Sequence, residues 1–379
     1  MKRLCALFAA LSLLPLGGCG LDGGIYSNYR SIEQLQLVRT LGVDFDGDGL
    51  ALSAAAGRPQ SGKPLLLSAR AAGLAAGTHA LQAQTPRGEL FFAHTQYLVL
   101  GQAFAGRGVA ELLDYVERDV CTRMGAGLFV VRGGSARSLI AGAGEDWDVN
   151  DVLTSLKAET DRRGDSHVFD VRETAVALSE SGAALICAIR AVDTEGSVFG
   201  LSPGVSAVPD GYGILKNGAL CGFLGGKQAQ AASLMLGKLG AVTRSFPDGA
   251  GGAVTLELRC GAPDLHFSRR PDGGLTLSVR IAPEAMIAAP GSDRLDTAAL
   301  TAAVNAALTE ELTRLLRRSQ AENADFLALG RALRLQGVDP ASLPADWLQN
   351  LTWEVTVETS IRHSYDLRER AGTDGGGAP

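Results

Sequence analysis

The order of hydrophobic and polar positions predicts short strands that alternate with helices along most of the chain. Apolar runs and period-two alternation indicate strands, whereas apolar residues three and four positions apart indicate helices. The predicted strands are 89–100, 128–131, 171–177, 183–192, 212–215, 219–224, 254–260, 265–269, 275–281 and a closing strand after Trp347. The predicted helices are 31–35, 73–84, 109–118, 135–141, 227–239, 297–318 and a short one continuing from 325–330. This alternation predicts an α+β fold of mixed or antiparallel sheets with flanking helices.

Several of these strands are expected to pair with antiparallel neighbours. Lys216-Asn217-Gly218 has the composition of a tight hairpin turn, and the strands 171–177 and 183–192 are close enough to form another pair. The strands between 254 and 281 alternate apolar and polar residues, which predicts a meander with one face on a core. The acidic stretch 145–151 is interpreted as a loop.

The sequence Gly200-Leu201-Ser202-Pro203-Gly204 matches the G-x-S-x-G pattern of a hydrolase nucleophile elbow. In that elbow the residue after the serine donates its N–H to an oxyanion, and Pro203 has none. We therefore interpret this stretch as a loop that divides an N-terminal α+β domain, 20–203, from a C-terminal one, 204–368. The second domain could comprise two subdomains that divide near 285, and the Gly-rich end, 369–379, predicts a disordered tail.

The N-terminus has the organisation of a bacterial lipoprotein signal. Lys2 and Arg3 precede an apolar run from Leu4 to Leu16, and Gly17-Gly18 lead into Cys19. The run of about 13 residues is shorter than the roughly 20 that a transmembrane helix needs, which indicates a cleaved segment. We expect residues 1–19 to be the signal with its lipidation cysteine, and Cys19 to carry acyl chains, palmitate among them, that hold the body at the membrane.

Composition limits the classes of molecule that the mature body is expected to bind. Loss of Lys2 and Arg3 leaves 33 basic and 41 acidic residues, a net charge of −8, which argues against nucleic acid. Four widely spaced cysteines remain besides Cys19, without a C-x-x-C pair, so we expect no metal site, and whether they form disulfides stays open. They are Cys121, Cys187, Cys221 and Cys260.

No catalytic or cofactor-binding constellation is apparent, and we expect neither an enzyme nor a cofactor. Asp44-Phe45-Asp46-Gly47-Asp48-Gly49 opens like a calcium loop, but its twelfth position is Ala55 instead of a glutamate. A hairpin turn between Leu41-Gly42-Val43 and Leu50-Ala51-Leu52 is therefore the better interpretation. The histidines are scattered, His94 among them.

A series of short motifs occurs along the chain in this order: the lipobox at Cys19, Arg30-Ser31-Ile32-Glu33, Leu41-Gly42-Val43-Asp44, His94 with Tyr97-Leu98-Val99-Leu100-Gly101, Leu112-Leu113-Asp114, Arg118-Asp119, Gly213-Ile214-Leu215, Gly222-Phe223-Leu224, Gln320, Asp325-Phe326-Leu327-Ala328-Leu329-Gly330, Trp347 and Trp353. Their order resembles the Ger(x)C family, the lipoprotein C subunits of bacterial spore germinant receptors, over nearly the whole mature chain. Two departures are the absence of a tryptophan in 20–29 and Lys227-Gln228 at the start of a helix where the family commonly has an acidic residue.

The resemblance implies a three-part α+β body on the outer face of the spore inner membrane. It implies assembly with an A-type and a B-type membrane subunit into a complex that responds to small nutrients during spore germination. If single residues act at an interface, Asp325, Gly330 and Trp347 are the candidates; the competing interpretation is a helix turn and a core aromatic residue.

Two other functions stay open at this level. An extracytoplasmic solute-binding lipoprotein of a transporter would have the same anchor, although its usual two doubly wound lobes conflict with the predicted meander. A structural lipoprotein of the vegetative cell envelope would differ in its time of expression.

Overall fold

The computed structural model describes residues 35–58, 61–86, 88–119, 122–143, 148–194, 204–247, 252–289 and 296–362. Several sequence predictions lie outside these described residues: the signal with Cys19, most of the short helix at 31–35, Cys121, the loop 200–203 and the tail 369–379. None of the helices in the described ranges is both long and apolar enough to cross a bilayer.

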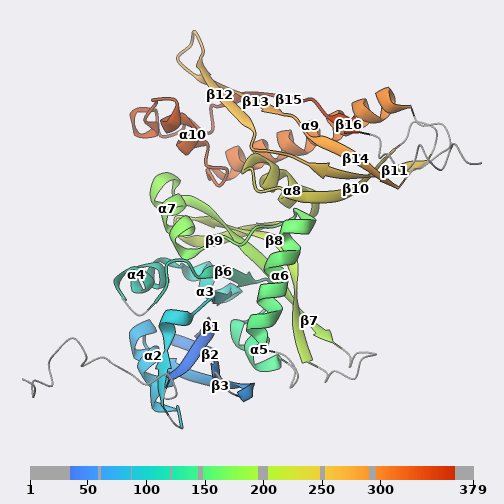
Figure 1. Ribbon diagram of the computed structural model, residues 1–379. Helices are drawn as coiled ribbons and strands as arrows, with labels where there is room; N and C mark the ends of the chain where they lie inside the picture. The colour runs from blue at the N-terminus through green and yellow to red at the C-terminus, as the bar shows by residue number, and fades with distance from the viewer. Residues whose placement is uncertain are drawn as a thin grey trace, which may run out of the picture.

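The first half of the chain is built on a nine-stranded mixed sheet (Figure 1). Its order is β3-β2-β1-β5-β6-β7-β8-β9, and β4 pairs with β1. The neighbours β1, β5, β6 and β7 run parallel, and the outer pairs are antiparallel. The strands are β1 (Leu35–Asp46), β2 (Gly49–Arg58), β3 (Ser61–Ala71), β4 (Glu89–Phe91), β5 (Tyr97–Gly101), β6 (Gly127–Val131), β7 (Ala183–Thr194), β8 (Gly204–Lys216) and β9 (Ala219–Leu224).

Helices cover both faces of this sheet, because parallel strands need crossover connections. Along β6, Leu128 and Val130 face one core and Phe129 and Val131 face the other. The first core also contains residues of α2 (Leu74–Ala83), α3 (Gln102–Arg107), α4 (Ala110–Arg118) and α7 (Val171–Ser181). The second contains residues of α5 (Ala136–Gly142) and α6 (Val149–Arg163).

The second half packs two small sheets against a long helix. A four-stranded sheet has the order β10-β11-β14-β16 and a three-stranded sheet the order β12-β13-β15. The strands are β10 (Ala241–Pro247), β11 (Ala253–Arg259), β12 (Asp264–Arg269), β13 (Leu275–Ile281), β14 (Glu284–Ala289), β15 (Thr352–Val357) and β16 (Ser360–Arg362). The helices are α8 (Gly226–Met235), α9 (Thr297–Glu322) and α10 (Leu329–Leu335).

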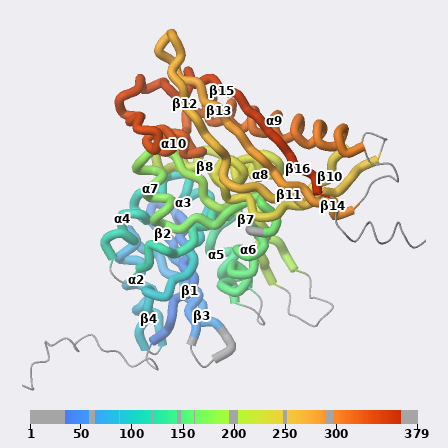
Figure 2. Tube along the Cα trace, turned by 45° about the horizontal axis from the view of Figure 1, so that its top comes forward, coloured from blue at the N-terminus to red at the C-terminus, as the bar shows by residue number. Residues whose placement is uncertain are grey.

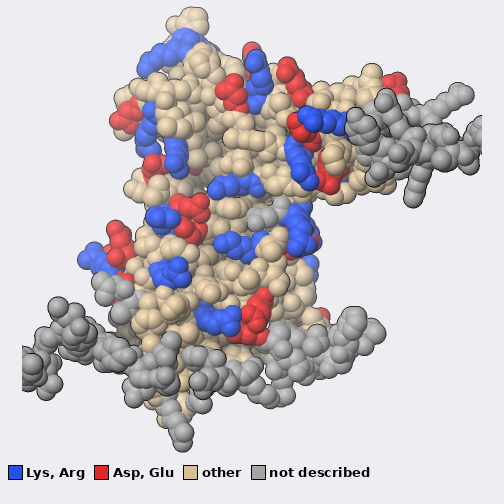
Figure 3. Space-filling model, viewed as in Figure 1, with Lys and Arg blue, Asp and Glu red and all other residues tan. Residues whose placement is uncertain are grey.

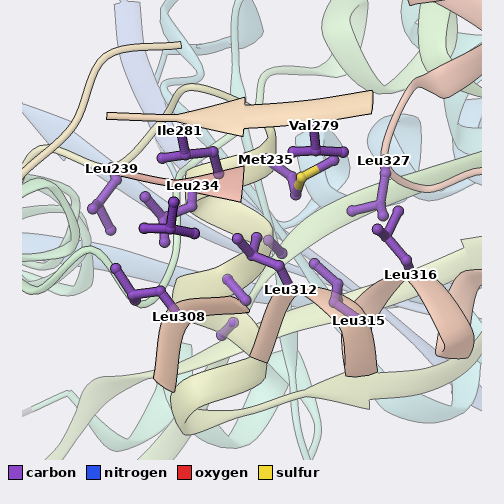
Figure 4. Close-up of a cluster of buried hydrophobic side chains, with 14 of the residues drawn as sticks. Leu234, Met235, Leu239, Val279, Ile281, Leu308, Leu312, Leu315, Leu316 and Leu327 are labelled. Atoms are coloured by element: carbon purple, nitrogen blue, oxygen red, sulfur yellow. The ribbon is translucent and has the colours of Figure 1, made fainter. Parts of the chain in front are cut away.

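The core of the second half continues onto the large sheet. Leu308, Leu312 and Leu315 of α9 face Leu234 and Met235 of α8 under β13 (Figure 4). The same buried cluster includes residues of three strands of the large sheet: Ala183, Leu185, Tyr212, Ile214 and Leu224. The two halves therefore share one hydrophobic core. In both views α7 and α10 lie next to each other at their junction (Figures 1 and 2).

The mixed α+β class is confirmed, as are the hairpins at 41–52 and 212–224 and most of the predicted helices. Residues 171–177 were predicted as a strand, and this is wrong: they begin helix α7. The helix starts because Asp170 and Glu173 form a capping box, in which each side chain accepts the backbone N–H of the other, at 2.7 and 3.1 Å. The antiparallel partner of β7 is instead β8.

The loop predicted at 145–151 ends earlier than expected, because α6 begins at Val149. Asp148 caps this helix through its side chain, which accepts the Asn150 N–H at 2.9 Å, and Gly164 ends it in the left-handed conformation. Val149, Leu153 and Leu156 of α6 are buried against the sheet. The prediction missed this apolar stripe.

Two further strand predictions need correction. The run 89–100 is divided by a 3₁₀ turn at Phe92–His94 into β4 and β5. The meander between 254 and 281 does not form, because β11 pairs with β10 and β14 while β12 pairs with β13 in the other sheet.

The short helix starts at Leu329, after Ala328 adopts a left-handed conformation, and not directly at Asp325. The division at 203/204 stays a prediction; the large sheet contains strands from both sides of it.

Candidate functional site

A cleft of about 540 Å³ lies at the junction of the two halves, between α7 and α10. Its walls also include the start of β7, the end of α8 and the segment 262–265. The lining is mostly apolar and contains Phe169, Val176, Ala177, Leu185, Met235, Leu236, Phe326, Leu327 and Leu335. Clefts of this size and character commonly bind ligands or partner segments.

The charged groups at the rim are mostly paired within the chain. Glu173 of α7 lies 3.6 Å from Lys238, and Glu180 lies 3.7 Å from Arg334 of α10. Arg172 lies 3.5 Å from Asp170. Figure 3 shows a largely uncharged band at the waist between α7 and α10, with charged side chains on both sides of it.

Asp325 lies at the edge of this cleft and organises the turn that precedes α10. The residue is 5% exposed, and its carboxylate accepts the backbone N–H groups of Leu329 and Gly330 at 2.8 and 2.7 Å. Burial raises the pKa of Asp325 to about 6, although the two N–H groups favour the charged form and oppose this shift. The carboxylate therefore fixes the start of α10 and does not point outward.

Gly330 makes room for this arrangement. A Cβ at this position would lie 3.2 Å from the Asp325 Oδ2, closer than most side-chain contacts. Asp325 and Gly330, both predicted as interface candidates, are thus brought together by the structure as two parts of one helix start.

Hydrogen bonds connect this turn to the large sheet and α7. The Ser181 hydroxyl donates to the Asp325 carbonyl at 3.2 Å, and Lys216 donates to the Glu322 carbonyl at 2.7 Å. Arg334 donates to the Glu180 carbonyl at 2.9 Å. The position of α10 relative to α7, and with it the cleft, is therefore fixed by polar contacts as well as by the shared core.

Trp347 lies elsewhere. It is half-buried, packs against the core of the second half and lines a separate cleft of about 450 Å³ beside the turn between β12 and β13. Trp347 is not on the cleft between α7 and α10.

The structure also describes the other residues singled out from the sequence, which are Asp44 and three of the cysteines. Asp44, the first residue of the rejected calcium loop, is buried and accepts the N–H groups of Ala136 and Arg137 at 2.8 and 2.7 Å, which starts α5. Cys187, Cys221 and Cys260 are free thiols, and burial raises the pKa of Cys187 to about 12. The described residues contain no group of three or more His, Cys, Asp or Glu residues that could hold a metal ion.

Sequence reasoning missed Val176, Arg331 and Leu335 as members of this cleft. A signal for Leu335 was present: α10 buries Leu329 and Leu333, and a residue two positions after Leu333 points away from that stripe. For Val176 the signal was lost, because its segment was predicted as a strand.

Comparison with known proteins gives two family matches and one similar structure. Residues 28–191 match "Spore germination protein N-terminal domain", and residues 210–365 match "Spore germination B3/ GerAC like, C-terminal". The crystal structure of the GerBC protein is similar to this chain with a TM-score of 0.55 at 17% sequence identity, over 87% of this chain and 99% of that one. At this identity the likeness concerns the fold. No curated protein sequence matches the chain.

Proposed function

The chain belongs to the GerAC-like family of spore germination proteins, and from this membership we propose that it is a lipid-anchored, non-catalytic subunit of a germinant receptor. The family is that of the receptor C subunits, so the resemblance drawn from the sequence is confirmed. The proposal adds an anchor at Cys19, a location on the outer face of the spore inner membrane, and a role in complex assembly or signal transmission.

The observation that carries the proposal is the presence of both family domains, in order, in one chain. A subunit that transmits a signal needs a body in which one end is mechanically coupled to the other. The core shared by the two halves and the hydrogen bonds around Asp325 supply this coupling. The proposed partners are the A-type and B-type membrane subunits of the same receptor.

The solute-binding alternative receives less support. Such a lipoprotein is expected to have two doubly wound lobes joined by a hinge, with its ligand between them. Here a single mixed sheet extends through the first half and its face continues into the core of the second.

The anchor is tested by replacing Cys19 with Ala in the full chain. We expect Cys19→Ala to leave the membrane fraction of spores and to slow nutrient germination, because the acyl chains that hold the body are no longer attached. Cys5→Ala is the matched control, since Cys5 lies inside the predicted signal and should leave both properties unchanged. Normal germination with a Cys19→Ala chain that is released from the membrane would refute the proposal.

A further inference from the structure

The two helices that flank the junction cleft present the same pair of residue types to it. Arg172 and Val176 lie four positions apart on α7, and Arg331 and Leu335 lie four positions apart on α10. Residues at this spacing share one face of a helix. All four line the cleft, so its rim combines two aliphatic side chains with two arginines.

The aliphatic side chains are unusually exposed. Leu335 is 83% exposed and Val176 is 42% exposed. Within the described part of the chain, only Leu66 and Met286 are comparable large hydrophobic residues, and neither lines this cleft. Two exposed aliphatic residues on one apolar cleft indicate a surface that another molecule covers.

Three basic and three acidic side chains line the cleft, so its formal charges balance, but one arginine has no partner in the described part of the chain. The carboxylates of Glu173 and Glu180 are paired with Lys238 and Arg334, whereas Arg331 has no hydrogen-bond or ion-pair partner among the described residues. Arg172 is largely exposed beside Asp170, its partner at 3.5 Å. Arg331, with the exposed Arg172 as a second group, is therefore the basic side chain of this rim that can pair with a carboxylate of another molecule.

We propose that the cleft between α7 and α10 is the docking site for a short, acidic amphipathic helix of a membrane-embedded partner subunit. This inference rests on the proposed function, because it assumes that such a partner exists. Apolar side chains of the helix would cover Val176 and Leu335, and its carboxylates would pair with Arg172 and Arg331.

The length of α7, which forms one wall of the cleft, suits such a segment. The 11 residues of α7 extend over about 16 Å, the length of three helical turns. Three turns offer two or three apolar positions on one face and leave room for two carboxylates beside them. A second copy of this chain is a poorer occupant, because two bodies of charge −8 repel each other at low salt.

The first test is capture of the full-length lipoprotein from detergent-solubilised spore membranes, with the wild type and two variants, Arg331→Glu and Leu335→Asp. We expect the wild type to retain its membrane partner and each variant to retain at least tenfold less. Met286→Asp is the matched control, because Met286 is an exposed apolar residue, 43% exposed, outside the cleft, and it should retain the partner fully. Unchanged thermal melting of the variants shows that they fold.

The outcomes separate the inference from the proposed function. If the wild type captures no polytopic membrane protein, the proposed function fails and the inference falls with it. If the wild type captures its partner and both variants do so equally well, the docking site is refuted while the proposed function stands.

A photoreactive residue placed at position 335 identifies what covers the cleft. We expect cross-links to an acidic segment of the partner, outside its membrane spans, with apolar residues three and four positions apart. Cross-links to a basic segment, to lipid alone or to a second copy of this chain would overturn the inference.

Discussion

Two buried aspartates, Asp44 and Asp325, hold helix starts in the same way. Each accepts two consecutive backbone N–H groups, and beside each stands a glycine that leaves room for the carboxylate. A Cβ on Gly101 would overlap Asp44, and one on Gly330 would crowd Asp325. These pairs account physically for two marks of the sequence resemblance, Val43-Asp44 with Leu100-Gly101 and Asp325 with Gly330.

Asp325 should make stability depend on pH. Its pKa is raised from 3.8 to about 6 in the folded chain, so the folded state binds the proton more tightly than the unfolded state. The contribution of Asp325 is therefore most favourable below pH 3.8 and decreases as pH rises through 6, by on the order of 3 kcal/mol. Asp325→Asn should remove this part of the dependence.

The measurement is the free energy of unfolding of the full chain at pH 4 and pH 7, for the wild type and for Asp325→Asn. We expect the asparagine to cost roughly 1–3 kcal/mol at pH 4, because its NH₂ group cannot accept a backbone N–H. Its cost at pH 7 should be smaller. An equal cost at both values would contradict the assignment.

Arg244 and Glu311 form the buried ion pair that joins β10 to α9. The guanidinium donates to both carboxylate oxygens, at 2.6 and 2.9 Å, and both side chains are less than 10% exposed. Arg244→Met should lower the free energy of unfolding by about 3–5 kcal/mol, because the buried Glu311 is left with only the largely exposed Lys227, 3.7 Å away, as an ion-pair partner.

An exposed pair provides the comparison. Arg362 and Glu284 lie 2.9 Å apart but are 65% and 56% exposed, so Arg362→Met should cost less than about 1 kcal/mol. Denaturant titration of the two variants measures the difference. Similar costs for both would mean that burial does not set the strength of the Arg244–Glu311 pair.

At the scale of elements, turn residues and hydrophobic spacing correctly predicted the hairpins and helices that are determined by neighbouring residues in the sequence. The hairpin at Asn217-Gly218 and the long helix α9 follow from turn residues and from the spacing of leucines, and both formed. Helix α7 was predicted as a strand because Val171, Thr174 and Val176 are β-branched, although its capping box was visible in the sequence. There, capping prevailed over intrinsic propensity.

Strand pairing in the second half could not be predicted from local patterns. β12 and β13 alternate as expected, but β15, more than 70 positions later in the chain, pairs parallel with β13, with Trp353 opposite Leu277. A period-two pattern predicts which face of a strand is buried, but it does not predict which other strand pairs with it.

One glycine is essential for the junction of β8, β9 and α8. Gly211 has φ of +82°, and a Cβ would overlap the Leu224 carbonyl oxygen; the next residue, Tyr212, is fully buried with its hydroxyl 2.7 Å from that of Ser233. Gly211→Ala should therefore destabilise the chain by at least about 2 kcal/mol, through both strain and displacement of Leu224.

Gly218→Ala is the matched control for this prediction. Gly218 has a similar φ of +79°, and a Cβ there meets no atom within 4 Å, so only the backbone strain of about 1 kcal/mol remains. Thermal unfolding of both variants tests this. Equal melting temperatures would show that the Leu224 contact is unimportant.

At the scale of the whole molecule, the candidate site is formed by segments that are far apart in the sequence and adjacent only in the folded chain. The cleft lies between helices whose contact, Arg334 to Glu180, joins residues 154 positions apart. The sequence indicated Asp325 and Gly330, which shape the start of α10. It did not indicate Val176 and Leu335, because these two residues come to the same cleft only when the chain folds. The family, in contrast, was identifiable from the order of motifs.

The central claim is membership in a membrane receptor complex, and the most direct test is affinity capture of the wild-type lipoprotein from detergent-solubilised spore membranes, with quantitative mass spectrometry of the bound proteins. The account predicts two polytopic membrane proteins, in fixed proportion to the lipoprotein, that are absent from a mock capture. Recovery of a transporter with an ATPase, or of the lipoprotein alone, would contradict it.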